Sequence, residues 1–214
     1  MMNIPYGRHY TDKADLDAVI EVLHGGMLTQ GPLVPKFEVE CAAFVGAQYA
    51  IAVSNATSGL HLACLALDIG PGSIVWTSAI TFVASANCAI HCGAEIDFVD
   101  IDFNTVNICP RALAKKLWQA KKTGTLPNLL IVVHMAGLSA DMVAIKALSE
   151  EFGFAVIEDA SHAFGGSFKS GKIGACDYSD LAVFSFHPVK MITTAEGGII
   201  TTNDEKLAKK VAML

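Results

Sequence analysis

Short apolar runs rich in β-branched residues recur along the chain, and several are separated by segments with a helical pattern. Runs that are apolar at consecutive positions indicate strands buried on both faces, which is typical of a parallel sheet covered by helices. The alternation predicts an α/β fold, a three-layer α/β/α sandwich with a mostly parallel seven-stranded sheet. The expected strands are Tyr49–Ser54, Ile74–Thr77, Ile96–Val99, Leu129–His134, Ala155–Glu158, Leu181–Phe184 and Gly198–Thr202.

The segments between and after these runs predict helices. Pro110 suits the first position of a helix, and Asp141 is a candidate N-cap for apolar residues that recur every three or four positions. The last segment begins like a capped helix and stops while still apolar, with no turn or cap residue after it, so we expect the chain to be cut rather than finished. No domain linker is expected within residues 1–214. The expected helices are Thr57–Leu67, Thr81–His91, Pro110–Lys122, Asp141–Phe152 and Asn203–Leu214.

Composition excludes several classes of protein. Hydrophobic residues make up 52% of the chain, but no stretch reaches the roughly 20 apolar residues of a membrane-spanning helix. The N-terminal MMNIPYGRHYTDKAD is polar where a signal peptide would be apolar, which predicts a cytoplasmic protein without a membrane partner. The net charge of −6 and the lack of a basic run argue against nucleic acid as a partner.

Two local patterns could suggest a metal or a nucleotide. Cys88 and Cys92 are four residues apart, but no second Cys or His pair lies nearby, so no metal site is expected. Gly166–Lys172 has the spacing of a phosphate-binding P-loop, but Ile173 stands where the magnesium-binding hydroxyl should be. This segment is better interpreted as a turn between two short strands, and we do not expect nucleotide hydrolysis.

Polar side chains follow most of the expected strands. In open α/β sheets, ligands bind beyond the carboxyl ends of the strands, so we expect these residues to face one rim. They are Asn55 to Gly59 after the first strand, Thr81 and Phe82 after the second, His134 after the fourth, Asp159, Ser161 and His162 after the fifth, and Ser185, His187 and Lys190 after the sixth.

Each of these residues alone has an ordinary structural explanation. Asn55 could simply cap a helix, Asp159 could cap a strand end, and Lys190 could be a solvated loop lysine. Together they meet the needs of pyridoxal phosphate (PLP): a helix N-terminus for the phosphate, an aromatic ring for stacking, a carboxylate for the ring nitrogen and an amine for a Schiff base. The set therefore predicts a PLP site.

Five motifs carry a resemblance to a known family. The chain resembles the DegT/DnrJ/EryC1/StrS sugar aminotransferases, which have the type I PLP fold. The combination NATS, TFVASAN and ITTAEGG is most similar to members that act in pseudaminic acid biosynthesis. The matching stretches are LTQGPLVPKFE (28–38), AVSNATSGLHLA (52–63), TSAITFVASAN (77–87), IEDASHAFGG (157–166) and SFHPVKMITTAEGG (185–198).

The resemblance implies a role for each matched residue. Lys190 would form the internal aldimine and move the proton between the sugar C4 and the cofactor C4′; some relatives with histidine there are dehydrases, so lysine implies transamination. Asp159 would pair with the pyridine nitrogen, Phe82 would stack on the ring, and His162 would lie close to the ring face or the 3-hydroxyl. The phosphate would be held by Ala56, Thr57 and Ser185.

The resemblance also implies substrates and partners. The expected reaction converts a UDP-linked 4-keto-6-deoxy sugar to the 4-amino sugar with glutamate as donor, at a site shared between the subunits of a homodimer. One departure is His134-Met-Ala-Gly137-Leu138, where family members often have Gln after the glycine. Family members continue into a smaller C-terminal domain, so we expect 1–214 to be the PLP-binding large domain alone. The alternative is a non-catalytic remnant that folds and binds PLP or dimerises without turnover.

Overall fold

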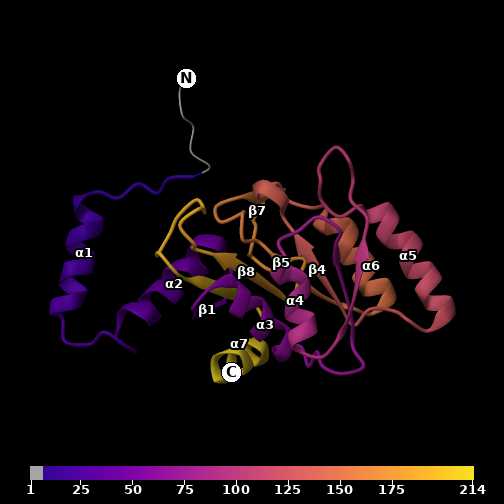
Figure 1. Cartoon of the computed structure of the whole chain (residues 1–214), viewed down its shortest axis with the longest axis horizontal. Helices are drawn as coiled ribbons and strands as arrows, with labels where there is room; N and C mark the ends of the chain where they lie inside the picture. The colour runs from indigo at the N-terminus through magenta and orange to yellow at the C-terminus, as the bar shows by residue number, and fades with distance from the viewer. Residues whose placement is uncertain (1–6) are drawn as a thin grey trace.

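A seven-stranded sheet with the order β1-β9-β8-β5-β4-β2-β3 forms the centre of the protein (Figure 1). The structure is a computed structural model and describes residues 7–214. Strand β9 is antiparallel to both neighbours, and the other adjacent pairs are parallel. The predicted fold is confirmed, and each strand matches its expected run to within one residue. The strands are β1 (Tyr49–Val53), β2 (Ile74–Ser78), β3 (Glu95–Val99), β4 (Leu129–Val133), β5 (Ala155–Asp159), β8 (Leu181–Ser185) and β9 (Gly198–Thr202).

Helices cover both faces of this sheet and complete the three layers. On β4, Leu129 and Ile131 pack with α3 and α4, whereas Leu130 and Val132 pack with α5 and α6 on the other face. Helix α7 joins the first layer, and α2 packs on the opposite face against β8 and β9. The helices are α1 (Lys13–His24), α2 (Leu33–Val45), α3 (Ala56–Ala66), α4 (Ala84–His91), α5 (Pro110–Thr123), α6 (Met142–Phe152) and α7 (Glu205–Met213).

The expected helices are present, but their bounds differ in one informative place. Helix α4 begins at Ala84 and not at Thr81, and Thr81 and Phe82, which precede it, line a cavity described below. The other four expected helices match within two residues at each end. The segment Gly166–Lys172 contains the antiparallel pair β6 (Ser167–Phe168) and β7 (Gly171–Lys172), in agreement with its interpretation as a turn between short strands.

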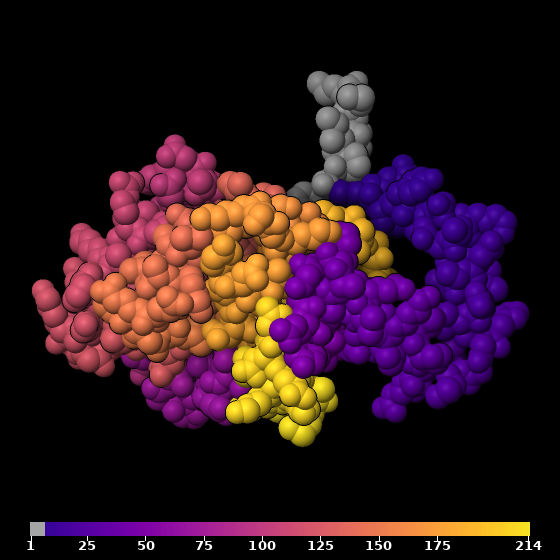
Figure 2. All heavy atoms as spheres, turned by 180° about the vertical axis from the view of Figure 1, so that it is seen from behind, coloured from indigo at the N-terminus to yellow at the C-terminus, as the bar shows by residue number. Residues whose placement is uncertain are grey.

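Two helices precede the first strand and were not predicted. Helix α1 has a capping box made by Asp12 and Asp15, and its apolar residues recur at helical spacing on one face. Within the described part of the chain α1 buries none of its side chains, and it stands off the body of the protein in the space-filling view (Figure 2). Its large exposed apolar residues, between 51% and 61% exposed, are Leu16, Val19, Ile20 and Leu23.

Among residues 7–214, no helix has both the length and the apolar character needed to cross a membrane. Residues 1–6, which are part of the N-terminal stretch judged above to differ from a signal peptide, lie outside the described residues.

Candidate active site

One cavity of about 700 Å³ opens at the carboxyl ends of the central strands. It is lined by all seven of the residues predicted from the sequence, together with the rim residues Thr81, Ser161 and His187. The seven are Ala56, Thr57, Phe82, Asp159, His162, Ser185 and Lys190.

Strand direction explains why residues distant in sequence meet here. Strands β5 and β8 are parallel neighbours, so their last residues, Asp159 and Ser185, reach the same edge of the sheet. Strand β1 runs in the same direction as β8, because both are antiparallel to the intervening β9. The turn that leads from β1 into α3 therefore lies at this edge too.

The N-terminus of α3 is built to receive an anion. The Asn55 side chain accepts a hydrogen bond of 2.8 Å from the Ser58 amide and caps the helix. The amides of Ala56 and Thr57 belong to the first turn, where no acceptor exists within the helix. Strand β9 lies directly against this turn, because a Cβ atom on Gly198 would be 2.8 Å from the nitrogen of Ala56. Free amides at a helix N-terminus bind phosphate groups well.

Ser185 adds a hydroxyl to the same part of the cavity. Its Oγ accepts a hydrogen bond of 3.4 Å from the His187 amide. The hydroxyl proton is then available for an acceptor in the cavity. The α3 amides and this hydroxyl together fit a phosphate group.

Asp159 is buried, with 4% of its surface exposed, and both of its carboxylate oxygens have partners. Oδ2 accepts from Ser85 Oγ at 2.6 Å, and Oδ1 accepts from Ser161 Oγ at 2.6 Å and from the Ser161 amide at 3.2 Å. Ser85 was not predicted as a site residue. Its contact joins positions 74 residues apart, so no local pattern could reveal it.

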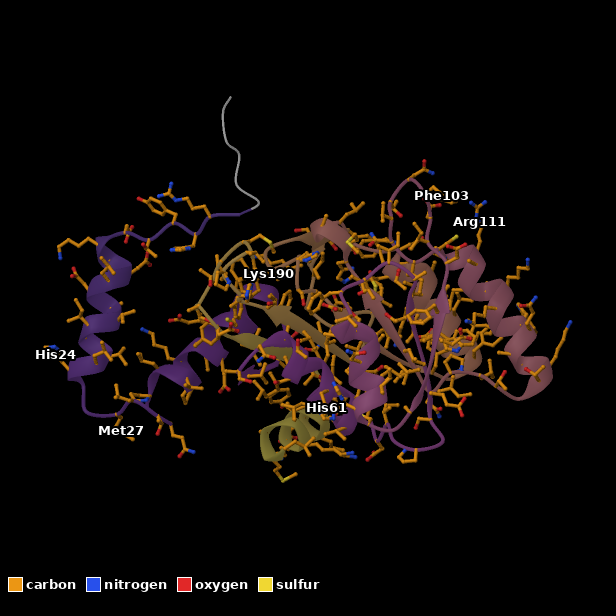
Figure 3. The ribbon with its side chains drawn as sticks, in the orientation of Figure 1. His24, Met27, His61, Phe103, Arg111 and Lys190 are labelled. Atoms are coloured by element: carbon orange, nitrogen blue, oxygen red, sulfur yellow. The ribbon has the colours of Figure 1, made fainter. Side chains whose placement is uncertain are left out.

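Lys190 lies on the loop after β8 and is partly buried in the cavity wall (Figure 3). Burial lowers the pKa of its amine below the usual 10.5, and the Asp159 carboxylate acts in the opposite direction. A lower pKa increases the fraction of neutral amine, which is the form that attacks an aldehyde.

His162 and Phe82 complete the walls. His162 Nδ1 accepts a hydrogen bond of 3.3 Å from the Ala136 amide, so its proton is on Nε2. Burial and the charge of Lys190 lower the pKa of His162, while Asp159 opposes them. Phe82 is 67% exposed and lines the cavity, as expected for a ring that covers a planar ligand.

His134 does not belong to this site, and its expected position on the rim is wrong. The ring is fully buried, with Nε2 2.7 Å from Glu158 Oε2 and with Nδ1 accepting from the Ala140 amide at 3.1 Å. His134 is the residue just after β4, and strand alternation directs it to the face opposite the cavity. Met135 lines the cavity in its place.

The turn that departs from the family pattern is strained. Ala136 has a left-handed φ of 53° and Gly137 a φ of 87°. A Cβ atom on Gly137 would be 2.8 Å from the carbonyl oxygen of His162. At this close approach the Ala136 amide donates a hydrogen bond to His162, whereas Leu138, which stands where family members often have Gln, does not line the cavity.

Known proteins resemble this chain in both sequence and fold. A family model described as the DegT/DnrJ/EryC1/StrS aminotransferase family matches residues 9–214. The spore coat polysaccharide biosynthesis protein SpsC of Bacillus subtilis is 43% identical over 99% of this chain and 52% of its own length. The chain thus spans about half the length of this curated relative.

Solved structures show the same fold. PseC of Helicobacter pylori, an aminotransferase of pseudaminic acid biosynthesis, is 32% identical with a TM-score of 0.89, over 98% of this chain and 54% of that one. Spr1654 of Streptococcus pneumoniae, in a PLP form, is 26% identical with a TM-score of 0.87, over 100% of this chain and 58% of that one. A structure of Spr1654 in its pyridoxamine phosphate (PMP) form has the same identity and TM-score, 26% and 0.87.

Proposed function

The chain belongs to the DegT/DnrJ/EryC1/StrS aminotransferase family, and from that premise we propose that its cavity binds PLP covalently through Lys190. One observation carries the proposal: the amine of Lys190, the carboxylate of Asp159 and the first-turn amides of α3 surround a single cavity. These are the three groups that the aldehyde, the ring nitrogen and the phosphate of PLP require. PLP supplies an electron sink that permits exchange of an amino group.

The residues of the chain would divide the work as follows. Lys190 Nζ would hold the cofactor and, when free, would be the base that moves a proton between the reacting carbon of the substrate and C4′ of the cofactor. Asp159 accepts a hydrogen bond from a protonated ring nitrogen. Phe82 covers one face of the ring and excludes water from it. The phosphate would bind Ala56, Thr57 and Ser185, and His162, with its proton on Nε2, would lie close to the ring face or the 3-hydroxyl.

For the substrate, we propose a UDP-linked 4-keto-6-deoxy-N-acetylhexosamine, converted to UDP-4-amino-4,6-dideoxy-N-acetyl-altrosamine with glutamate as the amino donor. The resemblance to PseC and the 43% identity to SpsC support a role in making sugars for pseudaminic acid or a related surface polysaccharide. We further propose that the protein works as a homodimer in the cytoplasm.

Trapping of the cofactor tests the central claim. Purified protein mixed with PLP should gain a visible absorption band, and borohydride reduction should leave a stable adduct on Lys190, found by peptide mass spectrometry. Lys190→Ala should abolish the band and the adduct, whereas Lys172→Ala, which removes a lysine outside the cavity, should keep both. A wild-type protein without the adduct would overturn the proposal.

A second assay separates turnover from binding. If the 214-residue chain acts as an aminotransferase, it should form the 4-amino sugar from the UDP-linked 4-keto sugar and glutamate. The alternative, a large domain that binds PLP without turnover, predicts the Lys190 adduct but no product. The alternative rests on the chain spanning 52% of the length of SpsC.

A further inference from the structure

A chain of hydroxyl groups leads from the cavity to the buried carboxylate of Asp159. Ser85, the second residue of α4, is fully buried and does not line the cavity. Its Oγ lies 2.6 Å from Asp159 Oδ2 and is also 2.7 Å from Oγ1 of Thr81, which does line the cavity. Ser85 therefore connects a cavity residue to the carboxylate without itself being able to reach a ligand.

The direction of the hydrogen bonds in this chain follows from the chemistry. An ionised carboxylate can only accept, so Ser85 must donate its single proton to Asp159. The Ser85 oxygen is then free to accept, and Thr81 must be the donor in the second bond. Successive hydroxyl bonds that point the same way strengthen one another. The chain therefore runs from Thr81 through Ser85 to Asp159.

The opposite carboxylate oxygen is held by Ser161, through both its hydroxyl and its amide. Donors on both oxygens leave the carboxylate little freedom to rotate about its Cβ–Cγ bond. Ser85 on one side and Ser161 on the other thus set the direction in which the remaining lone pairs of Asp159 face the cavity.

We propose that Ser85 is a positioning residue that orients Asp159 for a ligand with a protonated ring nitrogen. This inference rests on the proposed function, because the ring nitrogen is that of PLP. Removing the Ser85 hydroxyl takes one donor from Oδ2, and the carboxylate is then free to turn or to recruit water. The substitution should therefore lower the affinity only for a ligand that forms a hydrogen bond with Asp159.

The test compares two ligands that differ at one atom. PLP and its 1-deaza analogue, in which carbon replaces the ring nitrogen, are titrated into cofactor-free protein, and both dissociation constants are measured by absorbance. Ser85→Ala should weaken PLP binding by about 10-fold, the size of one hydrogen bond to a charged group, and leave the analogue within about twofold. In the Asp159→Asn background, Ser85→Ala should have no further effect on PLP.

A matched control comes from β2. Ser78 is a buried serine whose hydroxyl has no hydrogen-bond partner among the described residues. Ser78→Ala makes the same chemical change without removing a contact, and it should alter neither dissociation constant. If the melting temperature shows that Ser85→Ala is unfolded, Ser85→Cys replaces it, because a thiol is a weak hydrogen-bond donor. Ser85→Cys should likewise lower the affinity for PLP and not the affinity for the analogue.

The outcomes distinguish this inference from the function on which it rests. Equal weakening of PLP and the analogue, or no weakening of PLP, would overturn the role of Ser85 and leave the PLP site intact. Failure of the wild-type protein to bind PLP at Lys190 would overturn the proposed function and, with it, this inference.

Discussion

Glu158 and Asp159 are consecutive carboxylates at the end of β5, and each is 4% exposed. Because side chains alternate along a strand, the two point to opposite faces of the sheet. Glu158 accepts from His134 at 2.7 Å and from Ser179 at 2.5 Å, on the side of the sheet where Met142 of α6 and strands β6 and β7 lie. Asp159 faces the cavity with Lys190 and His162.

The two acids differ in whether their carboxylates can still bind a group from outside the protein. His134 accepts from the Ala140 amide at Nδ1 and therefore donates from Nε2 to Glu158, so every polar atom of this network has a partner within the protein. Asp159 has its hydroxyl donors and still borders open space. Equal burial thus accompanies two environments: the oxygens of Glu158 are paired within the protein, whereas Asp159 borders the cavity where we propose that a ligand binds.

Removal of the Glu158 side chain should destabilise the protein more than any other substitution considered below. Glu158→Ala leaves the buried N–H of His134 and the hydroxyl of Ser179 without an acceptor, and we expect it to lower the free energy of unfolding by about 3–5 kcal/mol. Urea denaturation measures the loss. Glu158→Gln, which keeps one acceptor, should lose less, and a change below about 1 kcal/mol in the alanine variant would contradict the assignment of a structural role.

Asp159→Asn should leave the stability of the protein almost unchanged and weaken its binding of PLP. We expect its free energy of unfolding to stay within about 1 kcal/mol of wild type, because the amide oxygen still accepts from one serine. The dissociation constant for PLP should rise about 10- to 100-fold, since a hydrogen bond to a charged group is lost. A large loss of stability with unchanged PLP affinity would show that the two acids do not differ as described.

The contact between the Ala136–Gly137 turn and His162 can be tested by substitution of Gly137. Gly137→Ala should destabilise the protein by about 1–3 kcal/mol, because the residue has a positive φ and its new Cβ would meet the His162 carbonyl. Gly124→Ala is the matched control: its φ is 72°, with no atom within 4 Å of the new Cβ. We expect Gly124→Ala to cost about 1 kcal/mol, and equal costs would remove the contact with His162 from the explanation.

The smallest expected effect is on the pH dependence of cofactor attachment. Burial lowers the pKa of Lys190, so the rate of attachment of PLP, followed by visible absorbance, should rise with pH and reach half its maximum below 10.5. Asp159 raises that pKa, so Asp159→Asn should move the midpoint to still lower pH, whereas Glu158→Gln should leave it in place. A wild-type midpoint at or above 10.5 would contradict the effect of burial.

Local pattern predicted most of the fold. The apolar runs, the N-cap at Asp141 and the helix-initiating Pro110 depend on neighbours in sequence, and they placed seven strands and five helices close to their observed bounds. Helices α1 and α2 were missed although α1 carries helical periodicity and a capping box, because the prediction began from the strands. The start of α4 was placed three residues early, since Thr81 and Phe82 were assigned to both the helix and the rim.

The sequence predicted most of the chemical groups that line the cavity, because residues that follow parallel strands emerge near one edge of the sheet, but the same rule also placed His134 there. Lys190, Asp159 and the α3 N-terminus follow from that rule alone. Only the tertiary structure decided that His134 faces away and that Ser85 holds Asp159. The packing of helices on the sheet decides which face of each strand is turned to α3 and α4, and the sequence of one strand does not contain this information. A contact between residues 74 positions apart likewise leaves no trace in the local pattern.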